Sequence, residues 1–71
     1  MVDMFPVASS RITEMGYDAD TATVYVRFTN GASWTYMNVP SDIWEQFVAS
    51  SSKGRFIKDV LDAYPNGPGG I

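Results

Sequence analysis

The chain has 71 residues, of which eight are acidic and five are Lys or Arg, with a formal charge of −3, no Cys and no His. Disulfides, metal sites built from thiolate or imidazole groups, and catalysis by a histidine acid or base are therefore excluded. An acidic chain is also poorly suited to general nucleic-acid binding, which depends on cations that neutralise phosphates, but it is compatible with a small anionic ligand.

A chain this short has a marginal core, because a domain of about 60 residues buries only about 60% of the surface that its unfolded form exposes. Close packing and self-association are the remaining ways to stabilise it, so a homo-oligomer is one expectation. No apolar run reaches the length of about 18 residues that a transmembrane helix needs. The first residues also lack the basic region and apolar stretch of a signal peptide, and we expect a cytoplasmic protein with no membrane contact.

The first half of the chain predicts strands. Residues 1–8 have no clear periodicity and contain Pro6, so an N-terminal arm is expected there. Residues 10–17 predict a first strand, and the Asp-rich segment 18–21 predicts a turn, since Asp side chains bond to their own backbone. Residues 22–28 alternate strictly and are rich in β-branched and aromatic side chains, which predicts a second strand.

Asn30-Gly31 follows this strand and is the strongest short-range signal for a β-hairpin, because a type I′ turn needs a positive φ at both central residues. The signal predicts a two-residue loop and a third strand over residues 32–39. Pro40 has no N–H group to donate to a ladder, so it is expected to end that strand.

The second half of the chain predicts two helices. Ser41 or Asp42 is the expected N-cap of the first, whose apolar stripe consists of Ile43, Trp44, Phe47 and Val48. The second helix is expected from about Ser52 to Tyr64, with a similar stripe, and residues 66–71 are expected to be a flexible tail. The predicted fold is therefore α+β, in which residues 9–65 form a three-stranded antiparallel meander followed by two amphipathic helices packed on one face.

A two-residue loop would pair Arg27 with Trp34 and Tyr25 with Tyr36. Those four side chains would then share one face, with the Arg27 guanidinium in cation–π contact with the Trp34 ring. The opposite, aliphatic face is the better partner for the helices, which leaves the aromatic face for solvent, a ligand or a second copy. The alternative interpretation is that the aromatic side chains pack against the helices as part of the core.

A second candidate site is the segment that opens the second helix. It could gather free backbone N–H groups and two cations, or it could be a plain helix cap. The segment consists of Ser52, Lys53, Gly54 and Arg55. Catalysis is not expected, since the carboxylates fall on turns, caps and polar helix faces, and the adjacent residues Ser52 and Lys53 do not face each other on a helix.

Several of these pieces, in this order and spacing, resemble the KTSC domain family over roughly residues 7–65. The matching pieces are Val7, Ser9-Ser10 and Ile12; Gly16-Tyr17-Asp18; Val24, Val26, Phe28 and Asn30-Gly31; Val39-Pro40; Ala49; and Ser52-Lys53-Gly54. The central Tyr-x-Tyr of the family is Trp34-Thr35-Tyr36 here, and Lys58 stands where the family often has Asn after two aromatic residues.

The resemblance implies a small domain that occurs at the C-terminus of some lysyl-tRNA synthetases and by itself in bacteria and phages. Its attachment to a synthetase suggests RNA binding. We therefore expect a non-enzymatic module, without a cofactor or metal, that binds a nucleotide or RNA, and in a phage-like protein one that could sequester a nucleotide signal. The expected ligand-binding residues are Tyr25, Arg27, Trp34, Tyr36, Ser52, Lys53, Gly54 and Arg55. The alternative is a protein-interaction or homo-oligomerisation module that uses the same aromatic face.

Overall fold

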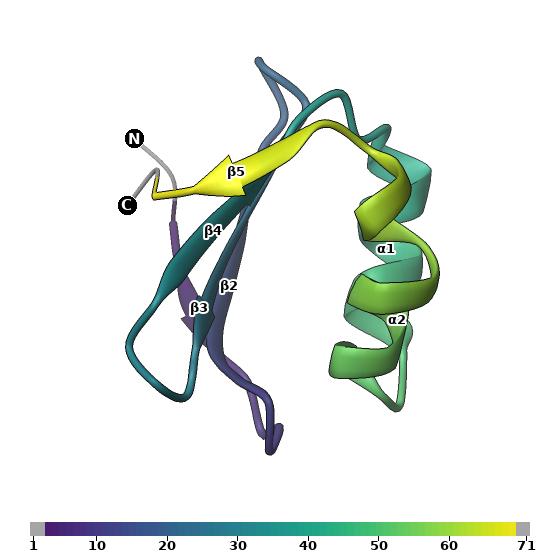
Figure 1. Cartoon of the computed structure of the whole chain (residues 1–71). Helices are drawn as coiled ribbons and strands as arrows, with labels where there is room; N and C mark the ends of the chain where they lie inside the picture. Colours follow the sequence, from purple (N-terminus) through teal and green to yellow (C-terminus); the bar gives the residue numbers. More distant parts are fainter. Residues whose placement is uncertain (1–2, 70–71) are drawn as a thin grey trace.

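Five antiparallel strands form one sheet in sequential order, and the two helices lie across one face of it (Figure 1). The computed structural model describes residues 3–69. The elements are β1 (Phe5–Pro6), β2 (Ile12–Asp18), β3 (Thr23–Phe28), β4 (Ser33–Tyr36), α1 (Ser41–Ala49), α2 (Lys53–Asp59), the 3-10 turn η1 (Leu61–Ala63) and β5 (Asn66–Pro68). The α+β class and the two helices on one face are confirmed, but a three-stranded meander is less than the sheet contains.

The two additional strands come from segments that were expected to be irregular. In the arm, Phe5 pairs with Met15, and in the tail, Gly67 pairs with Thr35. Both β1 and β5 contain a proline and both lie at an edge of the sheet, where a residue without an N–H group costs no ladder hydrogen bond. In this chain, the prolines of the two terminal segments therefore indicate edge strands, whereas they were taken to indicate irregular structure. The outer parts of the expected arm and tail, residues 1–2 and 70–71, lie outside the described residues.

The β3–β4 hairpin has a three-residue loop, so the predicted two-residue loop is wrong. The Phe28 amide donates to the Ala32 carbonyl at 2.8 Å, and the Gly31 amide donates to the Phe28 carbonyl at 3.0 Å. Gly31 has a φ of +89°, whereas Asn30 does not have the positive φ that a type I′ turn requires. The Asn30 side chain instead accepts a hydrogen bond from the Ala32 amide at 3.0 Å. The loop thus matches the hairpin type in which a left-handed glycine forms a bulge.

This one-residue difference exchanges the faces of β4, because successive side chains of a strand point to opposite sides. Val26 pairs with Trp34 and Val24 pairs with Tyr36, so both aromatic residues lie on the face that the helices cover. The predicted aromatic face, which placed them with Tyr25, is therefore wrong. The interpretation of the aromatic residues as core holds for Tyr36, which is 2% exposed.

Arg27 lies on the uncovered face with Tyr25, opposite Ser33 instead of Trp34. Its guanidinium Nε donates to the Glu14 carboxylate at 3.0 Å across the β2–β3 ladder. The expected cation–π contact with Trp34 is therefore replaced by a cross-strand ion pair.

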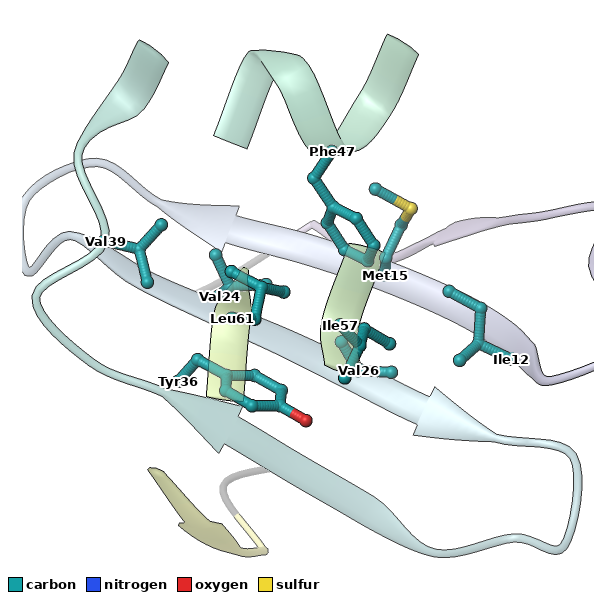
Figure 2. Close-up of a cluster of buried hydrophobic side chains, with 9 residues drawn as sticks. All are labelled: Ile12, Met15, Val24, Val26, Tyr36, Val39, Phe47, Ile57 and Leu61. Carbon is teal, nitrogen blue, oxygen red and sulfur yellow. The ribbon is translucent and has the colours of Figure 1, made fainter. Parts of the chain in front are cut away.

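The core fills the space between the sheet and the helices. Figure 2 shows Phe47 of α1 and Ile57 of α2 directed toward Val26 and the other sheet residues. Among residues 3–69, the buried hydrophobic residues are Ile12, Met15, Val24, Val26, Tyr36, Val39, Phe47, Ile57 and Leu61. Stacked aromatic rings pack beside these residues. The ring of Trp44 is stacked on that of Tyr17, with a centroid distance of 5.3 Å.

Both helices differ from their predicted bounds. Pro40 is the N-cap of α1 and makes no side-chain capping bond, so Ser41 is already helical and neither Ser41 nor Asp42 is the cap. The second helix ends at Asp59, because Val60 leaves the helical conformation with a φ of −121° and the chain continues as η1. This break turns the chain toward the sheet, which lets residues after Tyr64 pair with β4.

We expect Gly31→Ala to destabilise the domain by about 1–2 kcal/mol, because an L-residue at a left-handed φ is strained even though the added methyl group would meet no atom within 4 Å. Gly67→Ala is the matched control, since its methyl group would also meet no atom within 4 Å and its φ is not positive. Urea denaturation followed by circular dichroism measures both. Equal stability of the two variants would contradict the proposed loop.

Candidate functional site

An open cleft with a volume of about 800 Å³ lies between the β3–β4 hairpin and α2. Its wall is formed by the aromatic and apolar side chains of the hairpin on one side and by α2 and η1 on the other. The lining residues are Arg11, Phe28, Asn30, Ala32, Trp34, Tyr36, Gly54, Ile57, Lys58, Asp62 and Asn66. We call this the aromatic cleft.

The aromatic cleft has two chemically different ends. At the hairpin end, the Arg11 carbonyl accepts a hydrogen bond from the Thr29 amide at 3.1 Å. The Arg11 side chain lies against Gly54. At the other end, Asp62 lies close enough to Tyr36 to influence its hydroxyl electrostatically. One end therefore carries a cation and the other a carboxylate.

The position of Gly54 requires a residue without a side chain. A Cβ atom at this position would lie 3.1 Å from both Cβ and Cγ of Arg11, which is tighter than ordinary contact. The absence of a side chain at Gly54 thus lets the Arg11 side chain cross the start of α2.

Trp34 is held in a fixed orientation at the wall of the aromatic cleft. Its indole Nε1–H donates to the Asn66 Oδ1 at 3.0 Å, and the Asn66 amide nitrogen donates to the Tyr64 carbonyl at 2.8 Å. The side chain is only partly buried and packs against the core. A ring that is already ordered loses little entropy when a flat ligand stacks on it.

The Tyr36 hydroxyl group stays protonated over a wide pH range. Burial raises the pKa of Tyr36 to about 12, and the negative charge of Asp62 adds to this effect. Tyr36 is thus a neutral residue of the cleft wall at physiological pH, able to donate its proton in a hydrogen bond.

A second, more polar cleft of about 450 Å³ adjoins the first. It is lined by Ala8, Ser9, Ser10, Arg11, Ser51, Ser52, Lys53, Gly54, Arg55, Lys58 and Asp59. We call this the serine cleft. Arg11, Gly54 and Lys58 line both clefts, so the two are neighbours on the surface. Four of the five Lys and Arg residues of the chain line the serine cleft, and the fifth, Arg27, is paired on the uncovered sheet face.

Lys53 has a structural partner within this region. Its ammonium group donates to the Val48 carbonyl at 3.0 Å and also to the Ser50 carbonyl. These carbonyls belong to the end of α1, where backbone acceptors lack helical partners, so Lys53 caps that helix. An ammonium group that donates these bonds has no lone pair with which to accept a proton from Ser52. Ser52 itself makes no side-chain capping bond to α2.

The predicted site residues therefore divide into three groups. Trp34 and Tyr36 meet in the aromatic cleft, and Gly54 joins them there. The segment from Ser52 to Arg55 lines the serine cleft. Tyr25 and Arg27 lie on the opposite face of the sheet.

Eight residues that line the aromatic cleft were not among the predicted site residues, and they include Arg11, Lys58, Asp62 and Asn66. The only signal available for them was that Lys58 interrupts the family pattern. Arg11 precedes a strand and Asp62 follows a helix, and neither position distinguishes a ligand contact from a solvated charge.

The comparisons with known proteins agree with this fold. The family model described as "KTSC domain" matches residues 8–64. A curated protein of Tsukamurella paurometabola is 38% identical over 58 residues, which cover 82% of this chain and 87% of that protein. The chain also resembles the crystal structure of a KTSC domain protein from Yersinia pestis, with a TM-score of 0.91 and 31% sequence identity, over 99% of this chain and 100% of that one.

The chain belongs to the KTSC domain family, and the resemblance seen in the sequence is confirmed. Among residues 3–69 of this protein, no helix is long and apolar enough to cross a membrane.

The raised pKa of Tyr36 predicts a loss of stability in alkali. In the unfolded chain Tyr36 ionises near pH 10, whereas in the folded chain it ionises near pH 12, so the unfolded state is favoured increasingly between these values. The free energy of unfolding should fall by at most about 1.4 kcal/mol per pH unit from this group. Tyr36→Phe should reduce the decline and Tyr25→Phe should not, as measured by urea denaturation at several pH values. If the free energy of unfolding declined equally with pH in both variants, the alkaline loss of stability could not be attributed to Tyr36.

Proposed function

We propose that this KTSC domain is a non-enzymatic module that binds a nucleotide or a short single-stranded RNA. The base enters the aromatic cleft and stacks on Trp34, and the phosphate lies toward the serine cleft. The observation that supports the proposal is that the two clefts are neighbours and share Arg11, Gly54 and Lys58. A nucleotide has the same two parts, a flat apolar ring and an anion, joined by a short sugar.

The size and lining of the aromatic cleft support this proposal. Its volume of about 800 Å³ lies in the range of about 300–1,000 Å³ that small-molecule sites occupy. Stacking of a base on an aromatic side chain contributes about 1–3 kcal/mol without requiring a particular base. Trp34 is suitable for stacking because its ring is partly exposed and held by Asn66.

The charge distribution supports a short ligand. The chain has a net charge of −3, yet Arg11, Arg55 and Lys58 gather at the serine cleft. Arg55 forms an exposed ion pair with Asp59 at 3.5 Å, which is a weak interaction that a phosphate can compete with. A long polynucleotide would also meet the acidic remainder of the surface, whereas one or a few phosphates can stay within the basic region.

The alternative function is self-association or binding of a protein through the uncovered face of the sheet. In favour of it, within the described part of the chain both helices lie on the opposite face, which leaves Tyr25 half-buried without a helix over it (Figure 1). A dimer that sediments as such and dissociates on Tyr25→Glu, together with no nucleotide binding, would favour this alternative.

Isothermal titration calorimetry with the four nucleoside monophosphates and with a short oligoribonucleotide tests the proposal. We expect binding that Trp34→Leu weakens by roughly 5- to 150-fold, the equivalent of losing one stacked base. Tyr25→Leu is the matched control, because it removes an aromatic ring from the other face of the same sheet and should leave binding unchanged. Arg11→Gln should weaken binding and reduce its salt dependence without removing any core side chain.

Two outcomes would contradict the proposal. One is the absence of binding to every nucleotide and RNA tested. The other is an equal loss of affinity in Trp34→Leu and Tyr25→Leu, which would place the ligand elsewhere. Circular dichroism of each variant confirms that it is folded before its affinity is compared.

A further inference from the structure

Asp62 is the one carboxylate among the described residues that line the aromatic cleft. Neither of the ion pairs found between residues 3 and 69 involves it, since these join Arg27 to Glu14 and Arg55 to Asp59. Asp62 lies on η1, beyond the last residue of α2, whereas the Arg11 side chain contacts Gly54 in the first turn of that helix. A negative charge at that position would repel a phosphate, so Asp62 suits a ligand group that donates hydrogen bonds.

The two asparagine side chains of the cleft already have partners. Asn66 accepts from Trp34 and donates to Tyr64, and the Asn30 oxygen accepts from the Ala32 amide. Lys58 and Arg11 line the serine cleft as well, so they lie on the side assigned to the phosphate. Asp62 and the neutral Tyr36 hydroxyl thus remain to contact the edge of a base stacked on Trp34, and Asp62 is the charged one of the two.

We infer that the aromatic cleft selects guanine, and that the Asp62 carboxylate accepts hydrogen bonds from the N1–H and the 2-amino group of that base. This inference rests on the proposed nucleotide-binding function and names the class of nucleotide. Asp62 is then a specificity-determining residue, while Trp34 and the cations supply binding that does not depend on the base.

The chemistry of the bases leads to this choice. An ionised carboxylate only accepts hydrogen bonds, and it binds best to two adjacent donors that match its two oxygens. Guanine is the common base that presents two adjacent donors, N1–H and N2–H₂. Adenine and cytosine each present an amino donor beside a ring nitrogen that accepts, and uracil presents one N–H between two carbonyl groups. Each of these would place an acceptor against the Asp62 carboxylate.

The same carboxylate also orients the ligand. Asp62 lies on η1, whereas the Arg11 side chain lies at the start of α2, and of these two residues only Arg11 also lines the serine cleft. A guanine nucleotide can therefore satisfy both ends at once, with its base edge at Asp62 and its phosphate beside Arg11 and Lys58. The reversed orientation would bring a phosphate to a carboxylate and leave the cations unpaired.

Calorimetric titration with GMP, IMP, AMP and UMP tests the inference. A two-bond contact to a base edge discriminates by about tenfold or more, so we expect GMP to bind at least tenfold more tightly than AMP or UMP. IMP, which has the N1–H but lacks the 2-amino group, should lie between them. Asp62→Asn should lower the affinity for GMP by about tenfold and leave AMP within about twofold, because the amide no longer offers two acceptors. Asp20→Asn is the control, since it makes the same charge change at a residue that lines neither cleft.

The results separate failure of this inference from failure of the proposed function. Equal affinity for all four nucleotides, lost on Trp34→Leu, would overturn guanine selection and leave nucleotide binding intact. A preference for GMP that Asp62→Asn does not alter would overturn the role of Asp62. No binding of any nucleotide to the folded protein would overturn both.

Discussion

The conformation of Gly31 is the constraint on which the rest of the molecule depends. Its φ of +89° closes a three-residue loop, and this loop sets the pairing of Val26 with Trp34 and of Val24 with Tyr36. With one residue fewer in the loop, the two aromatic side chains would turn to the uncovered face. The core would lose Tyr36 and the aromatic cleft would lose its wall. A single backbone angle therefore decides both the packing of the sheet and the chemistry of the candidate site.

The sharing of residues between core and cleft has a consequence for function. Tyr36 is buried in the core and lines the cleft, and Trp34 packs against the core while its ring stays partly exposed. A chain of 71 residues has few side chains to spare, so a site built from core residues needs no separate scaffold. The site is then as rigid as the core itself, and substitutions at Trp34 or Tyr36 will affect stability and binding together, unlike those at Asp62.

Much of the fold followed from sequence patterns, and the errors have physical causes. Alternation in β3 and the apolar stripes of the helices depend on local periodicity, which a sequence displays directly. The loop length does not follow from periodicity, because Asn-Gly also suits a three-residue loop in which only the glycine has a positive φ. The edge strands were missed because proline was taken as a break. In the site, Trp34 was recognised by its chemistry, whereas Arg11 and Asp62 come together only through the tertiary fold, across the contact of Arg11 with Gly54.

The pairing across the β3–β4 hairpin can be measured directly by NMR. The Phe28–Ala32 hydrogen bond makes Arg27–Ser33 and Tyr25–Thr35 the closely spaced, non-hydrogen-bonded pairs of the ladder. This pairing predicts strong nuclear Overhauser effects between the Hα atoms of each of these two pairs. Strong Hα–Hα effects between Phe28 and Ser33 and between Val26 and Thr35 would show a two-residue loop, and would contradict the placement of Trp34 and Tyr36 in the cleft.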